Sequence, residues 1–242
     1  MAKMAKKVLI TGANKGIGKQ IARQMGKNGW IVLVGARNEE RGLAAAGELL
    51  AEDIAAEYVN IDLRDPKTIA AAARGIESRH ADLSMLINNA AIPGDMRKPG
   101  YEFTADELRG VMETNFFGPF ELTRLLLPTL EKNNGRVVNI SIPIGVSSRF
   151  NPFAYKTTKA ALNVMTQSLA QNFTERDKAV EIFSIMPGAT TTDLNGNITG
   201  KSVKTAEAAG KLIAGFILDG KNHNGELINE NGAVADYNHG LF

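Results

Sequence analysis

The sequence predicts an α/β fold, a doubly wound parallel sheet of about seven strands with helices on both faces. Short apolar runs alternate with longer helical patterns, and such an alternation gives a parallel sheet with right-handed crossovers. Several of these runs are apolar almost throughout, as expected for strands that are covered on both faces. No linker or internal repeat divides the chain of 242 residues, so we expect a single domain over residues 1–242.

The strands are predicted from the apolar runs, in the order in which these occur along the chain. We expect strands at residues 8–10, 31–34, 57–61, 83–87, 136–140, 180–185 and, last and shortest, 226–228. Three irregular segments, at residues 91–103, 142–153 and 187–204, each follow a strand. They should therefore gather at the carboxyl edge of the sheet, where ligands bind in such folds.

Helical patterns occupy the intervals between these strands. We expect helices over residues 17–27, from Asp65-Pro66 onward, from Thr104 toward residue 130, over 155–172 and over 205–218. The second begins with a capping side chain and a proline in the first turn, and the third begins with a capping box. Pro119 should bend the third helix or remove one of its hydrogen bonds.

Composition excludes several kinds of protein. A formal net charge of +2 is too balanced to indicate nucleic-acid binding, and the absence of cysteine excludes disulfides and thiolate metal sites. The histidines have no metal-ligand spacing, so we expect no metal and interpret them as surface or loop polarity: His80, His223 and His239. The first apolar run is too short for a signal peptide, and no segment is long enough to span a membrane. We expect a cytoplasmic protein.

A glycine-rich loop follows the first predicted strand and opens the first predicted helix. Its glycines, spaced Gly-x-x-x-Gly-x-Gly, let the backbone approach a pyrophosphate, and the helix amino end offers N–H groups and a positive dipole. A glycine turn without a ligand is the alternative, because glycine loops alone are a weak signal. The residues expected to bind a dinucleotide here are Gly12, Asn14, Lys15, Gly16, Ile17 and Gly18.

The end of the second strand favours a phosphorylated cofactor. An NAD enzyme would carry an acidic residue here to bond the ribose hydroxyls, but the sequence has Ala36 followed by Arg37. Lys15 and Arg41 add positive charge, and an arginine can grip a phosphate with two parallel bonds. An exposed charged turn is the plainer alternative. Because the acid is missing, we expect NADP rather than NAD.

Tyr155 and Lys159 stand one turn apart on one face of a predicted helix. A free tyrosine has a pKa of roughly 10, which makes it a slow acid near neutrality. A nearby ammonium stabilises the phenolate, so we expect Lys159 to lower the pKa of Tyr155. Such a pair in an arbitrary helix would usually mean nothing, and its position after the glycine loop is what makes it a candidate acid–base pair.

These motifs, in this order, resemble the short-chain dehydrogenase/reductase family along nearly the whole chain. The resemblance implies a Rossmann fold and hydride transfer with a nicotinamide cofactor, in which Tyr155 is the proton donor and Lys159 also holds the cofactor. The segments Thr-Gly-Ala-Asn-Lys-Gly-Ile-Gly, Gly-Ala-Arg-Asn-Glu-Glu-Arg and Asn-Phe-Phe-Gly look most like the carbonyl reductase group. That likeness implies NADPH-dependent reduction of aldehydes or ketones to alcohols.

The resemblance assigns further residues at matching positions. Asn115 would be the family's structural and proton-relay asparagine. The remaining cofactor contacts would come from Asp62 and Leu63 beside the adenine, Asn89 and Ala90 at the end of the central strand, and Pro187, Gly188 and Thr192 near the nicotinamide. Ala91 stands where the family has a glycine.

One position departs from the family. Its catalytic serine lies thirteen residues before the tyrosine, and that position holds Ile142, which cannot donate a hydrogen bond. Ser141 is adjacent, but neighbouring strand side chains point to opposite faces, so it reaches the site only if the strand has already ended, which Pro143 would favour. An ordinary strand-end hydroxyl is the alternative for Ser141. Ser147 and Ser148 lie further along the loop.

Isoleucine at the serine position predicts an apolar substrate pocket. The residues expected to line it are Ile142, Phe150, Phe153, Met186 and Leu194. Apolar or aromatic carbonyl compounds fit such a pocket better than sugars. Two other functions stay open: an NADP-binding regulatory protein with impaired catalysis, and reduction of a conjugated double bond on the same fold.

The resemblance also bears on association. Monomeric mammalian carbonyl reductases carry an insertion before the tyrosine that blocks association through helix faces. Only residues 142–154 separate strand from helix in this sequence, which leaves no room for that insertion. A homodimer or homotetramer is therefore implied, acting on a small-molecule carbonyl or alcohol substrate.

Overall fold

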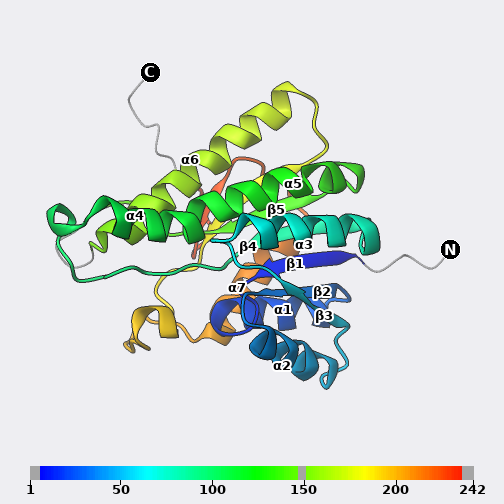
Figure 1. Ribbon diagram of the computed structural model, residues 1–242, viewed down its shortest axis with the longest axis horizontal. Helices are drawn as coiled ribbons and strands as arrows, with labels where there is room; N and C mark the ends of the chain where they lie inside the picture. Colours follow the sequence, from blue (N-terminus) through cyan, green and yellow to red (C-terminus); the bar gives the residue numbers. More distant parts are fainter. Residues whose placement is uncertain (1–5, 147–150, 236–242) are drawn as a thin grey trace.

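The computed structural model describes residues 6–146 and 151–235, which contain one parallel sheet with helices on both faces (Figure 1). Its seven strands are β1 (Lys7–Thr11), β2 (Ile31–Ala36), β3 (Ala56–Asn60), β4 (Leu83–Asn88), β5 (Arg136–Ile140), β6 (Glu181–Met186) and β7 (Leu227–Asn229). Each predicted strand ends within about two residues of the observed one, an ordinary boundary error. The predicted doubly wound Rossmann architecture is confirmed.

The strand order is β3-β2-β1-β4-β5-β6-β7, with parallel pairing throughout. The chain builds outward from β1 to β3, then returns to place β4 on the other side of β1. The direction of winding therefore changes between β1 and β4. Open α/β sheets bind ligands at such a switch point, outside the carboxyl ends of the strands.

Helices form two layers that bury both faces of the sheet. They are α1 (Gly16–Lys27), α2 (Glu39–Leu50), α3 (Pro66–Arg79), α4 (Ala105–Met112), α5 (Gly118–Lys132), α6 (Phe153–Glu175) and α7 (Ala206–Leu218). Helices α1, α2 and α7 lie on one side of the sheet, and α4, α5 and α6 lie on the other (Figure 1). Residues of β2 alternate between the two cores, because Val34 packs with α1 and Leu33 packs with α3 and α5.

Helix α2 was missing from the sequence prediction, which interpreted its start only as a phosphate-binding turn. Asn38 caps this helix by accepting a hydrogen bond from the Arg41 N–H at 2.9 Å. Glu39 and Glu40 then favour the first turn electrostatically. These starting signals, followed by buried Ala45 and Leu49, were the overlooked evidence for a helix.

The long helix expected from Thr104 is two helices. The predicted capping box is present, because Thr104 and Glu107 each bond the other's backbone N–H. A π-helical turn over Glu113–Phe117 then separates α4 from α5. Pro119 is the second residue of α5 and follows this π-helical turn directly, so its missing N–H lies where the helical hydrogen bonding changes. The interruption was predicted, but its form was not.

Two of the histidines are buried, so their interpretation as surface polarity is wrong, although both lie in connecting segments as the alternative of loop polarity expects. His80 closes α3 and lies 3.4 Å from a carboxylate oxygen of Glu57. His223 lies between the carboxylates of Asp219 and Glu226, which supply polar partners away from water. His239 lies outside the described residues.

Residues 6–146 and 151–235, which the structure describes, contain no group of three or more histidine or carboxylate side chains placed to hold a metal ion. They also contain no helix long and apolar enough to cross a membrane.

Candidate active site

The predicted site residues follow the carboxyl ends of the strands. Since the strands are parallel, these ends meet at one edge of the sheet. After β1 comes the glycine loop, residues 12–18, after β2 comes Arg37, after β4 comes Asn89, and after β5 comes Ser141. The segment from Pro187 onward follows β6 at the same edge.

The glycine loop is shaped by close backbone approaches. Gly12 has a φ of +67°, and a Cβ built on it would lie 2.9 Å from Cα of Ala90. A Cβ on Gly18 would collide with the Asn89 amide and with the Gly12 carbonyl. Both positions therefore require glycine. Without side chains at these positions, a ligand can approach the backbone of the loop closely.

The amino end of α1 suits an anion. Lys15 occupies the capping position, yet no side chain bonds the first-turn N–H groups and no acidic residue lies in that turn. Uncapped N–H groups and the helix dipole attract negative charge. Ile17 meanwhile anchors the turn by packing against the core below it. The loop thus fits the pyrophosphate of a dinucleotide.

A hydrogen-bond network ties the glycine loop to β4. The Asn89 side chain donates to the Thr11 carbonyl at 2.9 Å. The Thr11 hydroxyl accepts bonds from the Asn89 and Ala90 N–H groups at 3.0 and 3.1 Å. Asn89 and Ala90 are therefore held beside the loop, as the predicted cofactor contacts require. Thr11 itself was not predicted.

Charged residues surround the ends of β2 and β3. Arg37 and Arg41 are exposed, and Asp62 is bonded by Arg64 through both its backbone and its guanidinium. Burial opposes ionisation of Asp62, but the bonds from Arg64 and the charge of Arg37 together lower its pKa. The Leu63 side chain is buried in the core, and the contact of this residue with an adenine ring stays a prediction.

Lys15 has a partner that the sequence did not indicate. Its ammonium lies 2.8 Å from Oδ2 of Asp193, in the short 3₁₀ turn Asp193–Asn195 beyond β6. Thr192 also approaches the loop, with its methyl carbon 3.8 Å from where a Cβ of Gly16 would stand. The predicted nicotinamide contact Thr192 thus adjoins the glycine loop. Gly188, at the base of the same segment, would clash with Glu230 if it carried a Cβ.

Tyr155 and Lys159 lie together on α6, as predicted. Tyr155 is 9% exposed and Lys159 is 2% exposed, and the ammonium lies 5.7 Å from the centre of the tyrosine ring. Lys159 donates to the Ile140 carbonyl at 2.7 Å. Burial lowers the pKa of Lys159 to about 8 and raises the pKa of Tyr155 to about 12.

The raised pKa of Tyr155 corrects one expectation. The sequence argument considered only the charge of Lys159, which stabilises a phenolate. In the folded chain, burial of the phenol raises its pKa, because the anion loses its hydration. Tyr155 therefore holds its proton firmly across the neutral range.

Asn115 connects the loop after β4 to α6. It lies in the π-helical turn, and its side chain exchanges two hydrogen bonds of 2.9 Å with the backbone of Ile92. It also donates to the Thr158 hydroxyl at 3.0 Å, beside Lys159. These contacts position α6. The predicted proton relay through Asn115 stays a prediction.

Ser141 follows the last residue of β5 and is 2% exposed. Its N–H extends the ladder by donating to the Ile185 carbonyl at 2.9 Å. Its hydroxyl has no hydrogen-bond partner within the part of the chain that the structure describes. Ile142 is partly exposed, and its carbonyl accepts a long bond of 3.4 Å from Asn163 of α6.

The predicted substrate residues come from separate elements. Phe153 begins α6 and places its ring 5.6 Å from that of Phe103, in the loop after β4. Leu194 is partly buried in the 3₁₀ turn, and Met186 is buried at the end of β6. Phe150 lies outside the described residues.

A row of buried polar side chains beneath the site escaped the sequence analysis. Asn88, Asn139 and Ser184 occupy matching positions on β4, β5 and β6. Asn88 donates to Asn139 at 2.9 Å, and Asn139 donates to Thr166 of α6 at the same distance. Thr166 also bonds Ser184 at 2.8 Å. This polar row fixes α6 to the sheet, and polar residues inside apolar strands were its visible signal.

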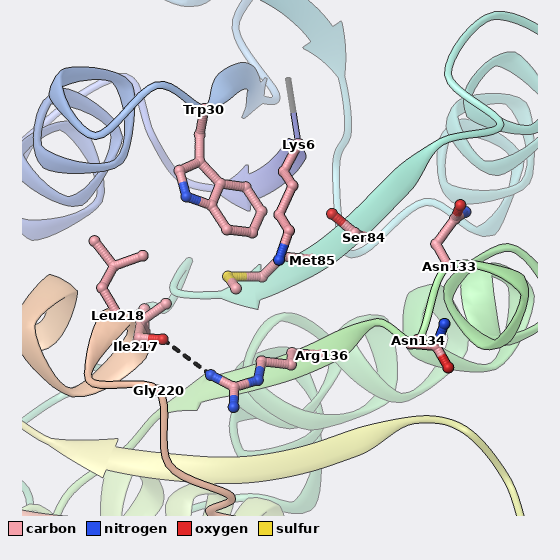
Figure 2. Close-up of a pocket in the computed structure, with 10 residues that line it drawn as sticks. All are labelled: Lys6, Trp30, Ser84, Met85, Asn133, Asn134, Arg136, Ile217, Leu218 and Gly220. Carbon is pink, nitrogen blue, oxygen red and sulfur yellow. Dashed lines mark hydrogen bonds between the residues drawn. The ribbon is translucent and has the colours of Figure 1, made fainter. Parts of the chain in front are cut away.

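A pocket of about 280 Å³ lies at the opposite, amino edge of the sheet (Figure 2). Trp30 and Lys6 line one side, and Arg136 lines another. The Arg136 guanidinium is already engaged, because it donates to the Ile217 carbonyl at 2.9 Å and pairs with Glu181 at 2.7 Å. None of the predicted site residues lines this pocket, so the candidate site remains at the carboxyl edge.

Comparison with known proteins gives concordant matches. A sequence model of the family described as short chain dehydrogenase matches residues 6–202. Carbonyl reductase (NADPH) 3 of Mus musculus is 28% identical over 276 residues, covering 95% of this chain and 98% of the mouse protein.

Two solved structures are similar over nearly their whole length. NADPH-bound carbonyl reductase from chicken fatty liver is 24% identical, with a TM-score of 0.84 over 96% of this chain and 99% of that chain. A short chain dehydrogenase from Shigella flexneri, complexed with NADP, is 27% identical, with a TM-score of 0.83 over 93% of this chain and 97% of that chain.

Proposed function

Because the chain belongs to the short-chain dehydrogenase family, we propose that it reduces aldehyde or ketone carbonyls to alcohols with NADPH. The observation that carries this proposal is the buried pair of Tyr155 and Lys159 at the edge that bears the uncapped glycine loop. The resemblance to the mouse carbonyl reductase adds support.

The preference for NADPH rests on charge at the end of β2. Ala36 is buried there and no acidic residue follows it directly, so the ribose hydroxyls lack the carboxylate that an NAD enzyme provides. Lys15, Arg37 and Arg41 are exposed cations that bind the 2′-phosphate. The Shigella relative that is complexed with NADP is consistent with this assignment.

When bound, the cofactor supplies a hydride to the carbonyl carbon. Tyr155 donates its phenolic proton to the oxygen, so that the carbonyl gains one hydride and one proton and leaves as an alcohol. Lys159 keeps its own proton below its pKa of about 8, and its positive charge favours loss of the tyrosine proton during the reaction. Asn115 holds this part of α6 in place through Thr158.

The carbonyl oxygen receives few other hydrogen bonds. Ile142 offers none, and the Ser141 hydroxyl is the nearest donor in sequence to the missing serine. Ile142, Phe153 and Leu194 supply apolar surface, which favours apolar or aromatic carbonyl compounds. A site with so few donors should be slow on ordinary ketones.

Association through α5 and α6 is part of the proposal. Phe120 of α5 and Val164 of α6 are large apolar side chains exposed on the protomer, and Phe117 just before α5 is exposed as well. We assign these three exposed side chains to a contact with another protein chain. A second copy of this chain would cover them in a homodimer or homotetramer.

The test is turnover of NADPH with a set of aromatic ketones and aldehydes, with product analysis. Formation of the alcohol supports the proposal. If an enone yields the saturated ketone instead of the allylic alcohol, the protein reduces conjugated double bonds. If NADPH binds but no substrate is consumed, the protein is a cofactor-binding regulator.

A further inference from the structure

The segment between β6 and α7 leaves the sheet and returns to it. Its ends are joined, because the Lys204 N–H donates to the Ala189 carbonyl and the Thr191 N–H donates to the Lys204 carbonyl, both at 2.9 Å. Lys204 also pairs with Glu230, just after β7. The base of this segment is therefore fastened to the body of the protein.

The tip of the segment carries Asp193 to the glycine loop. Its Oδ2 lies 2.8 Å from Nζ of Lys15, and the two side chains are 61% and 56% exposed. Asn197 donates a long bond of 3.4 Å to the other carboxylate oxygen. This ion pair joins two segments that are far apart in the sequence, and it is open to solvent.

The carboxylate of Asp193 contacts Lys15 and is affected by the charge of Arg41, two of the three cations assigned to the cofactor phosphate. The hydrogen bond from Lys15 and then its charge lower the pKa of Asp193, with a smaller contribution from the charge of Arg41. Lys15 and Arg41, two of the three residues proposed to bind the 2′-phosphate, therefore already interact electrostatically with Asp193.

We propose that Asp193 determines cofactor specificity by competing with the 2′-phosphate for Lys15, an inference that rests on the proposed use of NADPH. A cofactor with the 2′-phosphate must draw the ammonium away from Asp193. A cofactor without the phosphate leaves the ion pair intact. Asp193 therefore lowers the ratio of the affinity for NADPH to the affinity for NADH, and its removal should raise this ratio.

The experiment measures dissociation constants of the full chain for NADPH, NADH and adenosine 2′,5′-bisphosphate. Asp193→Asn should bind NADPH and the bisphosphate about two- to fivefold more tightly, the range expected for releasing an exposed ion pair. Binding of NADH should not change. In a Lys15→Met background, Asp193→Asn should lose most of this effect and keep only the small part that acts through Arg41.

The matched control is Glu131→Gln, which removes one negative charge from an exposed pair with Lys178 at the opposite edge of the sheet. It should leave all three constants unchanged. Unchanged or weaker binding of NADPH by Asp193→Asn would overturn the inference. An equal gain in the Lys15→Met background would overturn it too, because the effect would not pass through Lys15.

Failure of the proposed cofactor preference has a different signature. If the native chain binds NADH as tightly as NADPH, that preference is wrong, whatever Asp193→Asn does. If the native chain prefers NADPH and Asp193→Asn changes nothing, only the role of Asp193 is wrong.

Discussion

Lys159 on α6 donates its ammonium hydrogen bond to the carbonyl oxygen of Ile140, the last residue of β5, at 2.7 Å. The carbonyl dipole offsets part of the penalty of burying a cation. The same bond places the ammonium at the strand end from which Ser141 and Ile142 continue. The position of the proposed acid–base pair is thus coupled to the geometry of the segment that should supply the carbonyl donor.

Burial of Lys159 should make the folded chain less stable than it would be without this cation. Its pKa falls from an ordinary 10.5 to about 8, so the unfolded chain binds more protons between these values, and the free energy of unfolding rises with pH there. Below about pH 8 the whole penalty is present. Lys159→Met should stabilise the fold near pH 7 by at most about 3 kcal/mol, less the lost bond to Ile140.

Chemical denaturation near pH 7 and near pH 9.5 measures this effect, because the advantage of Lys159→Met should shrink as pH rises. Lys132→Met is the matched control at an exposed position at the end of α5, and its effect should not depend on pH. A difference that stays constant with pH would contradict the assignment.

Replacing Tyr155 tests the proton donor. Tyr155→Phe keeps the buried ring and removes only the hydroxyl, so the fold and the affinity for NADPH should persist. Carbonyl reduction should fall by about 10²-fold or more, the usual contribution of general acid catalysis. Steady-state turnover with one aromatic ketone measures it, and Tyr101→Phe, at a site that is 89% exposed, should remain active. Substantial turnover by Tyr155→Phe would mean that the proton comes from another group.

Replacing Arg37 tests the phosphate site. Arg37→Ala should weaken NADPH binding by about one to two decades, because charge-assisted bonds are worth roughly 1.5–3 kcal/mol. Binding of NADH should hardly change. Calorimetric titration with both cofactors decides, with Arg124→Ala on α5 as a control that removes another exposed arginine. Equal losses for the two cofactors would argue against a contact with the 2′-phosphate.

Two hypotheses for the hydrogen-bond donor to the carbonyl predict opposite results for variants at Ser141 and Ile142. If the donor is missing, Ile142→Ser should accelerate ketone reduction, by up to about 10²–10³-fold if the full interaction is restored. The gain should be smaller where the shorter side chain leaves space. If the unpartnered Ser141 hydroxyl already serves, Ser141→Ala should be crippling and Ile142→Ser nearly neutral. When neither variant alters turnover, Tyr155 alone orients the carbonyl.

A charge on the exposed face of α6 should prevent association. Val164 is 65% exposed on the protomer, so Val164→Asp should leave the fold intact while introducing a charge into the contact proposed with a second copy. Light scattering coupled to gel filtration should then give the mass of a monomer. Val146→Asp, in the exposed loop after β5, offers a comparison at another exposed valine. A native chain that is itself monomeric would refute the proposed oligomer.

Local patterns were sufficient to predict the sheet and most of the helices. Most strands are largely apolar runs, and Asp65 and Thr104 act as the helix caps that their sequence context predicted. Helix α2 was missed although Asn38 caps it, because the turn before it was interpreted only for its charge. Pro119 predicted an interruption of the long helix, but the contacts of Asn115 with Ile92 and Thr158 are tertiary, and no local pattern specifies them.

The closeness of Tyr155 and Lys159 was predictable from the sequence, but the direction in which the pKa of Tyr155 shifts was not. Tyr155 and Lys159 are adjacent as expected, yet the pKa of the tyrosine follows burial, which is a property of the folded whole. Leu63 faces the core for a similar reason, because its exposure depends on α5 lying against it. The contact of Lys15 with Asp193 joins residues 178 positions apart, a separation at which sequence patterns carry no information.

The polar row on β4, β5 and β6 helps to specify the register in which these strands pair. Strands buried on both faces are apolar at every position, so a slip of one or two residues would still bury apolar side chains. With Asn88, Asn139 and Ser184 aligned, any such slip would leave several amide and hydroxyl groups unpaired in the core, each at about 1–3 kcal/mol. These three polar side chains therefore destabilise sheets with a shifted strand register, which burial of apolar side chains alone would not distinguish from the native sheet.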